Sequence, residues 1–279
     1  MMGTAAMKLT VEWAGECFRV DVTRPVELAV PLDFYGPQPR AFGMPRARAE
    51  AVEGGDFVGD RRRGGSVNCE VVEFIAHGNA THTEGVGHIT KERISVGEIR
   101  LKPLLPAGLL TVPCRALGTT SETYDGLSDD QDQVICAADL QEARTAAGLG
   151  ERFLQALVIR AKSDELGRTL GDHSGTNPPY FTTEAMRWLR EVSCDHLLVE
   201  LPSVDREVDG GTVPNHHLFF GIRPDETPSE ESRARTITEM IRLPEELADS
   251  GFALDLQVPR FIMDAAPSRP ILYPLERIQ

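Results

Sequence analysis

Residues 182–201 read TTEAMRWLREVSCDHLLVEL, and this stretch gives the clearest indication of the fold class. Apolar residues recur at helical spacing between Ala185 and Val192, and Thr182 or Thr183 stands where a helix N-cap is expected. The apolar run 197–201 then predicts a buried strand that ends before Pro202. A helix that leads directly into a buried strand favours an α/β or α+β fold.

The rest of the chain interleaves predicted strands and helices in the same way. Alternating apolar and polar residues over 8–30 predict two or three N-terminal strands, and the prolines and glycines of 31–48 predict a long ordered loop. A helix followed by a strand is expected over 139–161. Further strands are expected at 70–76, 94–104, 109–117, 218–221, 254–258 and 261–263. The helices are too irregularly spaced for a (β/α)8 barrel.

The composition restricts the class of partner. The chain has 279 residues, 41% of them hydrophobic, with 29 basic against 43 acidic residues and a net charge of −14. This is too apolar for a disordered chain and long enough to bury a core. The acidic excess argues against nucleic acid or an anionic membrane surface as partner, because both require clustered Lys and Arg. The expected partner is therefore a small-molecule substrate or another protein.

The cysteines and the N-terminus indicate the compartment. The five cysteines are odd in number, far apart and without a CxxC pair, which is typical of reduced thiols and makes a thiolate zinc cage an unfavourable interpretation. No run approaches the roughly 20 apolar residues of a membrane span. Residues Met1 to Lys8 lack the apolar core and cleavage site of a signal peptide. We therefore expect a cytoplasmic protein.

A histidine cluster is the strongest chemical signal. Three of the seven histidines, His77, His82 and His88, fall within twelve residues, and Glu84 stands two residues after His82. In an extended chain this spacing places His82 and Glu84 on one face, where both reach one ion. Imidazole with carboxylate suits Zn²⁺, Mn²⁺ or Fe²⁺. The alternative is a polar surface loop whose histidines have no function.

Two further candidate ligands lie downstream. His216 precedes the apolar run 218–221, and Glu239 is an acid inside an otherwise apolar stretch. A buried glutamate needs a cation or a hydrogen-bond network to offset its desolvation. The alternative for Glu239 is the exposed face of a short helix or strand, and His217 is expected to point elsewhere.

Substrate-binding candidates are weaker. Phe34, Tyr35 and Phe42 in the long N-terminal loop offer aromatic surface for an aryl substrate, and ordinary loop packing is the alternative. The basic run 61–63 could attract a carboxylate, but a solvated turn before Gly64 is the preferred interpretation.

The motif around His82 resembles that of a known family. The string Thr81-His82-Thr83-Glu84-Gly85-Val86-Gly87-His88 resembles the H-x-G-T-H-x-D-x-P-x-H signature of the cyclase family of metal-dependent hydrolases, which includes kynurenine formamidase (arylformamidase) and isatin hydrolase. Four later segments resemble other family motifs in the same order: 182–189, 201–205, 215–222 and 238–243.

The resemblance implies a role for each matching residue. His82 is a metal ligand, Glu84 takes the place of the family's aspartate, and His216 and Glu239 are distal ligands. His88 is the general acid/base. Three positions depart from the signature, which indicates an outlying subgroup. Gly78 stands where the first histidine belongs, so a ligand role for His77 requires a one-residue bulge; Glu84 is one methylene longer than aspartate; and Val86 replaces proline.

The resemblance also implies a fold and a reaction. The fold is a single swivelling β/β/α-type domain over residues 1–279 with a central mixed sheet, to which 1–68 forms an extension. The reaction is arylformamidase-like hydrolysis of an amide, lactam or ester bond, in which one or two Zn²⁺ or Mn²⁺ ions activate water. Family members are commonly dimers or tetramers, so a homodimer or homotetramer is expected.

Two alternatives remain open. His82, Glu84 and His216 also satisfy the two-histidine-one-carboxylate triad of non-haem Fe(II) oxygenases. That interpretation leaves His77, His88 and Glu239 without a role and lacks a double-stranded β-helix pattern. The other alternative is a catalytically inactive protein that binds a metal or a ligand.

Overall fold

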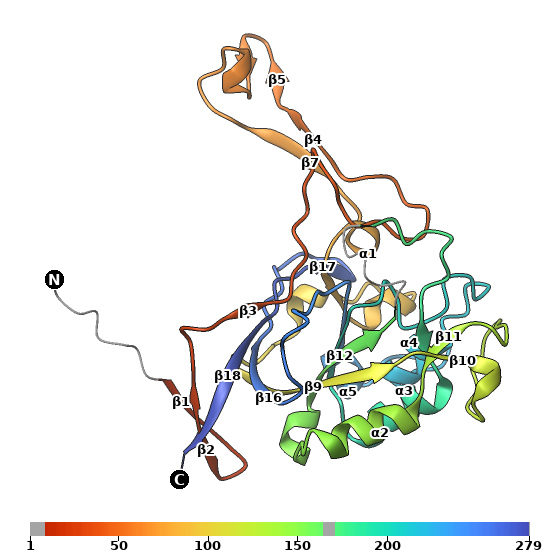
Figure 1. The fold of residues 1–279 in the computed structure, drawn as a ribbon. Helices are drawn as coiled ribbons and strands as arrows, with labels where there is room; N and C mark the ends of the chain where they lie inside the picture. The colour runs from red at the N-terminus through yellow and green to blue at the C-terminus, as the bar shows by residue number, and fades with distance from the viewer. Residues whose placement is uncertain (1–8, 164–170, 279) are drawn as a thin grey trace.

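A mixed sheet of eleven strands forms the centre of the computed structural model, which describes residues 9–163 and 171–278 (Figure 1). The segment Met1 to Lys8, in which we expect no signal peptide, lies outside the described residues. The middle of the sheet is a parallel run that consists of β9 (Leu105–Pro113), β12 (Ala156–Lys162), β14 (His196–Val199) and β15 (Thr236–Glu239). The order of the main path is β1-β2-β18-β16-β9-β12-β14-β15-β8-β17, and β3 pairs with β18.

The remaining strands of this sheet are antiparallel. They comprise β1 (Leu9–Trp13), β2 (Glu16–Val20), β3 (Val26–Glu27), β8 (His82–Glu84), β16 (Gly251–Asp255), β17 (Ala265–Pro267) and β18 (Ile271–Ile278). The hairpin of β1 and β2 pairs with β18, so the two ends of the described chain lie together at one edge of the sheet. The strand pair β8 and β17 closes the opposite edge.

The parallel strands are buried on both faces because their side chains alternate between two cores. Leu157 and Leu197 belong to the core under the helices, whereas Val158 and Leu198 belong to the core on the other face. In β14 the residues Leu197, Leu198 and Val199 are fully buried, in agreement with the buried strand predicted from the apolar run.

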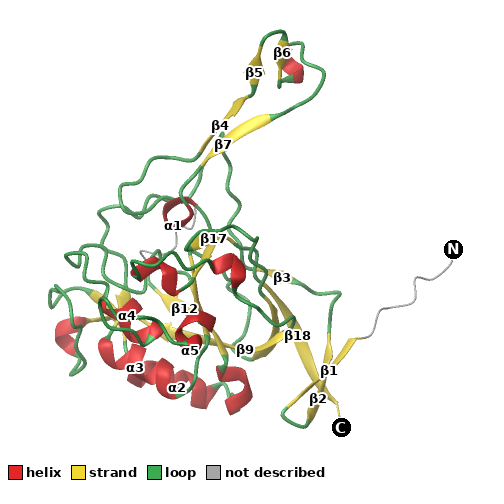
Figure 2. Ribbon diagram, turned by 180° about the vertical axis from the view of Figure 1, so that it is seen from behind, coloured by secondary structure: helices red, strands yellow, loops and turns green. Residues whose placement is uncertain are grey.

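The helices cover one face of the sheet (Figure 2). They are α2 (Ala137–Ala146), α3 (Thr183–Glu191), α4 (Pro214–Phe220) and α5 (Glu230–Ala234), while the single-turn α1 (Ala76–Asn79) lies near β17. As predicted, α3 begins after Thr182, whose hydroxyl accepts a hydrogen bond from Ala185 N at 3.1 Å. Trp188 and Leu189 on its buried face enter the core. None of the described helices has the length and apolar character that crossing a bilayer requires.

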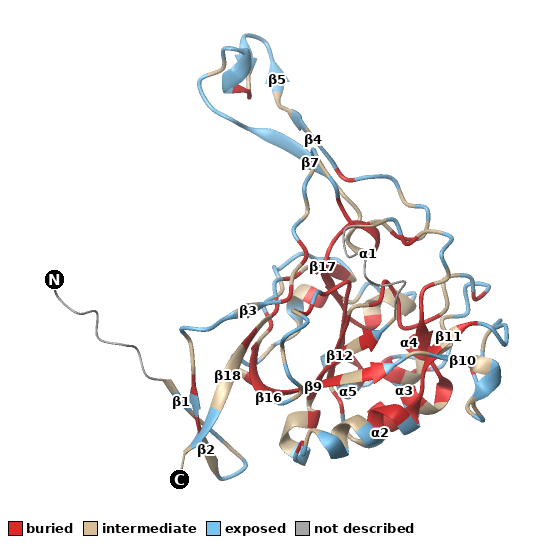
Figure 3. Cartoon of the chain, in the orientation of Figure 1, coloured by how far each residue is buried: buried red, intermediate tan, exposed pale blue. Residues whose placement is uncertain are grey.

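An arm, residues 48–73, projects from this body (Figure 3). It is built from β4 (Arg48–Ala51) paired with β7 (Glu70–Glu73) and from β5 (Glu53–Gly54) paired with β6 (Phe57–Val58). The predicted solvated turn at 61–63 is a short exposed 3-10 segment at its tip. A separate small sheet joins β10 (Arg115–Ala116), β11 (Gln133–Ile135) and β13 (Tyr180–Phe181).

The mixed α+β fold class is confirmed, and three expected strands are wrong. Residues 94–104 contain a 3-10 turn (Val96–Glu98) and no strand, and 261–263 are exposed and irregular. The run 218–221 lies in α4, because Pro214 at its first turn and Gly221 in the left-handed region at its end favour a helix. The strand at 70–76 is shorter than expected, and all four residues of β7 are exposed because it belongs to the arm.

Candidate metal centre

One continuous stretch, from α1 through β8 to the 3-10 turn Val86–Ile89, carries four of the candidate residues. Strand β8 pairs antiparallel with β15, and in this register His82 lies opposite Glu239. The Thr83 and Thr238 hydroxyls are hydrogen-bonded at 2.8 Å and mark the same register. The pairing brings together two candidate ligands that are far apart in the sequence.

His82 and Glu239 form the first contact of the cluster. His82 Nδ1 donates to the carbonyl oxygen of Ala80 at 3.0 Å, which leaves Nε2 facing Glu239 Oε2 at 3.4 Å. Both side chains are buried. The alternative interpretation, in which Glu239 lies on an exposed face, is therefore wrong, because the sheet edge that carries it is covered by β8 and β17.

Glu84 lies at the centre of the cluster and is completely buried. Its Oε1 is 3.0 Å from His216 Nε2, and its Oε2 is 3.2 Å from His77 Nδ1 and 3.8 Å from His88 Nε2. Burial by itself raises the pKa of this carboxyl group, but the surrounding imidazoles outweigh burial and hold the pKa well below its ordinary value. Three imidazoles thus surround one carboxylate.

His216 reaches Glu84 from α4 and is held from behind by Asp205. The Asp205 Oδ2 atom accepts from His216 Nδ1 at 2.6 Å, while its Oδ1 accepts from Tyr124 at 2.9 Å and from Asn215 N at 2.8 Å. Burial lowers the pKa of His216, but the Glu84 and Asp205 carboxylates outweigh burial and raise it well above its ordinary value. A carboxylate that fixes the outward nitrogen of an imidazole is the usual support of a metal-ligating histidine.

Asp264 is a member of the cluster that sequence reasoning missed. It precedes β17, and its Oδ2 lies 2.9 Å from His77 Nε2 and 3.2 Å from His88 Nδ1. Burial lowers the pKa of His77, but Asp264 and Glu84 raise it to about 10, and the two imidazoles hold the pKa of Asp264 well below its usual range. Only its position after an expected strand could have drawn attention to it.

The residues present fit a divalent metal ion. His82 Nε2, His216 Nε2 and both carboxylate oxygens of Glu84 are buried, and none of these atoms has a hydrogen bond within the described structure. Such atoms are costly to bury unless a cation or a proton satisfies them. Ligand atoms lie within 4.8 Å of one another in the groups His77/His82/Glu84, Glu84/His88/His216 and His77/His88/Asp264. Because Glu84 belongs to two of these groups, the donor set can hold one ion or two bridged ions.

The glycine that replaces the first histidine of the motif, and the glycine before His88, both have a local explanation. Met44 lies over Gly78 so closely that a Cβ there would stand 2.5 Å from its sulfur, and the imidazole comes from His77 instead. A Cβ at Gly87 would stand 2.1 Å from the carbonyl oxygen of Ile94, so only glycine permits the tight turn that presents His88.

The aromatic candidates differ in their distance from the cluster. Ala41 N donates to Gly78 O at 3.0 Å, so the loop that contains Phe42 lies against α1 and beside His77. Phe34 packs against Phe74, and the exposed Tyr35 bonds through its hydroxyl to Glu70 of the arm. A substrate-binding role for these three residues stays a prediction.

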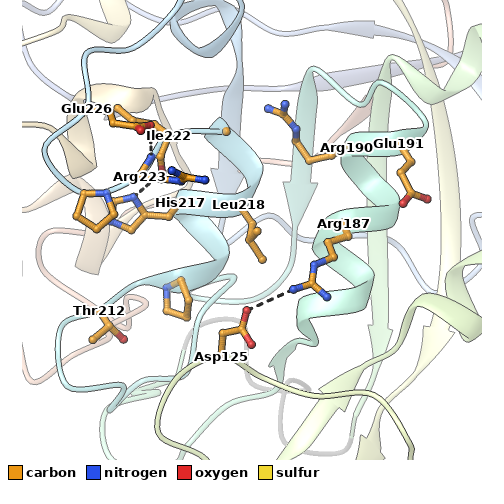
Figure 4. A pocket seen from close by; sticks show the side chains of 13 residues that line it. Asp125, Arg187, Arg190, Glu191, Thr212, His217, Leu218, Ile222, Arg223 and Glu226 are labelled. Atoms are coloured by element: carbon orange, nitrogen blue, oxygen red, sulfur yellow. Dashed lines mark hydrogen bonds and ion pairs between the residues drawn. The ribbon is translucent and has the colours of Figure 1, made fainter.

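A hollow of about 790 Å³ between α3 and α4 is separate from the cluster (Figure 4). His217 lines it and, as expected, takes no part in the cluster; its Nδ1 bonds to Ile222 O at 2.9 Å. The charges around the hollow balance, since its lining includes three arginines and three acidic residues: Arg187, Arg190, Arg223, Asp125, Glu191 and Glu226.

Comparison with known proteins identifies related sequences and folds. A model of the family described as "Putative cyclase" matches residues 20–206. No curated protein matches the chain significantly.

Several solved structures have a similar fold. An isatin hydrolase bound to the product analogue thioisatinate is 14% identical with a TM-score of 0.61, over 92% of this chain and 93% of that one. Isatin hydrolase A from Labrenzia aggregata, bound to benzyl benzoate, is 16% identical with a TM-score of 0.60, over 91% and 94%. A predicted metal-dependent hydrolase from Bacillus stearothermophilus is 14% identical with a TM-score of 0.54, over 90% and 98%.

Proposed function

The chain belongs to the cyclase family, and on that premise we propose that it is a metal-dependent hydrolase of a small-molecule amide, lactam or ester. One observation carries the proposal: buried ligand atoms of His82, Glu84 and His216 converge without hydrogen bonds of their own. The names of the structural neighbours, two isatin hydrolases and a predicted metal-dependent hydrolase, support it.

The proposed ligands are His77, His82, Glu84, His216 and Glu239, which would hold one or two Zn²⁺ or Mn²⁺ ions. A divalent ion at this position supplies a lowered pKa for water and polarisation of the carbonyl group of the substrate. The protein holds the imidazoles in place through Ala80 O behind His82 and Asp205 behind His216.

His88 is the proposed general base and acid. It is half-buried at the rim of the cluster, and its Nε2 faces inward at 3.8 Å from Glu84 Oε2. There Nε2 can accept a proton from the water whose oxygen attacks the carbonyl carbon. When the C–N or C–O bond breaks, the same nitrogen returns the proton to the leaving atom, so the imidazole ends the cycle neutral.

We propose an aryl amide or lactam as substrate, with N-formylkynurenine and isatin as the first compounds to test. Phe42 carries this finer proposal, since its loop lies against the helix of His77. An aromatic ring beside the cluster would stack on an aryl group while the carbonyl group reaches His88.

Metal analysis of protein purified without chelator, combined with a panel of formanilides, lactams and lactones, tests the function. We expect bound zinc or manganese, hydrolysis without oxygen, loss of activity on chelation and recovery when the metal is restored. His88→Gln is the matched control, because it should bind metal but not turn over substrate. Bound metal with no hydrolysis of any panel member would favour the inactive alternative, and oxygen uptake dependent on Fe²⁺ would favour the oxygenase.

We also propose that the protein forms a homo-oligomer through the arm. Val71 and Val72 lie on opposite faces of the β4–β7 ribbon, and their exposed fractions are 60% and 49%. A two-stranded ribbon is marginally stable alone in water, so both faces favour burial against a second copy. Light scattering should show a dimer or tetramer that V71K/V72K dissociates, whereas Val208→Lys, an exposed valine outside the arm, should have no effect. A monomeric native chain would refute this.

A further inference from the structure

Asp264 occupies a distinctive position at the mouth of the metal centre. It follows the exposed segment 261–263, while its own backbone is fixed: its carbonyl oxygen accepts from Gly85 N at 3.0 Å, and the next residue pairs with Glu84 in the β17–β8 ladder. The carboxylate is therefore anchored to the same strand that carries the central ligands. A side chain held in this way keeps its position relative to the cluster.

One oxygen of Asp264 contacts two histidines with different proposed roles. Oδ2 lies 2.9 Å from Nε2 of His77, a proposed ligand, and 3.2 Å from Nδ1 of His88, the proposed base. The two ring centroids lie 4.3 Å apart, and the ring planes are tilted by 30° to one another. An ionised carboxylate only accepts hydrogen bonds, so both facing nitrogens must carry protons.

These two protons determine what the opposite nitrogens can do. With a proton on Nε2, His77 turns Nδ1 toward Glu84 Oε2 at 3.2 Å, where it can bind an ion. With a proton on Nδ1, His88 turns Nε2 toward the cluster as an acceptor, as a general base requires. In the other tautomer of His77, an N–H group would point at the position proposed for the metal ion. In the other tautomer of His88, an N–H group would point at the position where the general base must accept a proton.

We propose that Asp264 is a positioning residue that fixes the tautomers of His77 and His88 together, so that one carboxylate prepares a metal ligand and the general base. This inference rests on the proposed hydrolase function. It differs from the support of His216, where Asp205 serves one imidazole from within the core. Here a half-exposed carboxylate serves two imidazoles at the rim.

Asp264→Asn tests the proposal, because the amide keeps one acceptor oxygen and offers N–H groups on its other side. Because one oxygen serves both histidines, the variant places either a neutral, weaker acceptor or an N–H group there, so the donor bonds of both rings are weakened or lost. Two-bond ¹H–¹⁵N spectra of the histidine side chains report each tautomer directly in zinc-loaded protein, with His77→Gln and His88→Gln for assignment. In the native protein we expect the Nδ1–H form of His88 and the Nε2–H form of His77. In the variant we expect a shift toward the Nε2–H form of His88 or the Nδ1–H form of His77.

The kinetic part of the test uses three variants. In Asp264→Asn we expect kcat to fall about 10–100-fold with KM nearly unchanged. Asp264→Glu, which keeps the acceptor-only carboxylate, should recover part of the loss. Asp249→Asn is the matched control, since Asp249 accepts two hydrogen bonds from Thr111 outside the cluster and its loss should change neither tautomers nor kcat.

Three results would overturn the inference. The first is that the tautomers are unchanged in Asp264→Asn. The second is that His88 has its proton on Nε2 in the native protein. The third is that the variant loses a bound zinc ion without a change of tautomer, which would make Asp264 a ligand. If no substrate is hydrolysed, the hydrolase proposal fails while the spectra still decide on the tautomers. If the enzyme is active and the tautomers do not respond, only the inference about Asp264 fails.

Discussion

Replacing Glu84 with Gln should nearly abolish the stabilisation that zinc gives the folded protein. Glu84 is completely buried and lies within 4 Å of three imidazole nitrogens, on His77, His88 and His216. The amide has nearly the same shape but carries no charge, and its N–H groups point toward a cation. We expect the affinity for zinc to fall at least about a hundredfold, because Glu84 is a proposed ligand and loss of even a supporting group costs about 10–100-fold.

The size of the effect follows from linkage. At a free zinc concentration about a hundred times the native Kd, binding stabilises the native fold by about 2.7 kcal/mol. With a hundredfold weaker affinity, the variant gains only about 0.4 kcal/mol at the same concentration. For a chain of this size these values correspond to zinc-induced rises in Tm of roughly 5–10 °C and about 1 °C.

Differential scanning calorimetry with buffered zinc, together with titration calorimetry, measures both quantities. Glu200→Gln is the matched control: Glu200 is a half-buried glutamate outside the cluster whose side chain accepts from Leu243 N at 3.1 Å. The control should keep the full zinc-induced shift. If Glu84→Gln showed the same zinc-induced shift in Tm as the native protein and the control, Glu84 would not be a ligand and the metal ion would have to bind elsewhere.

Three further predictions concern catalysis, pH and packing. His88→Gln should retain its zinc, measured by elemental analysis, while kcat falls ~100–10,000-fold in the hydrolysis assay. Burial lowers the pKa of His196 to about 4, so between pH 6.5 and 4 this histidine is protonated in the unfolded chain but not in the folded chain. About 3 kcal/mol of stability should therefore be lost as the pH falls from 6.5 to 4. Urea titrations of His196→Asn should show a flatter dependence of stability on pH. Leu157→Ala in β12 should cost about 2–5 kcal/mol in urea unfolding, whereas the exposed Leu127→Ala should cost less than about 0.5 kcal/mol.

The helix and strand at 182–201 were predictable because periodicity and capping agree there. Thr182 caps α3 as expected, and β14 is the buried strand that the apolar run indicates. A short apolar window fails where the residues that decide its structure lie just outside it or at its last position. The apolar run 218–221 has the composition of a strand, but Pro214 and Gly221 at its ends make it the end of a helix.

The site shows the same division between local and distant information. His82, Glu84 and His88 were found because they are close in the sequence, and the structure brings them together with the distant His216 and Glu239. Asp264 was missed because no local pattern marks it; it reaches the cluster only through the pairing of β17 with β8. The spacing of residues in the sequence indicates which side chains are neighbours along one strand. The pairing of strands that are far apart in the sequence cannot be predicted from a short stretch of sequence.

The spread of the site along the chain has a consequence for synthesis. The groups that surround Glu84 come from residues between His77 and Asp264, and β8 gains its neighbours β15 and β17 only after the last third of the chain has been made. A nascent chain emerging from the ribosome therefore displays three imidazoles and Glu84 long before His216, Glu239 and Asp264 have been made. The proposed metal centre therefore acquires its full ligand set only once β15 and β17 have been made and have paired with β8.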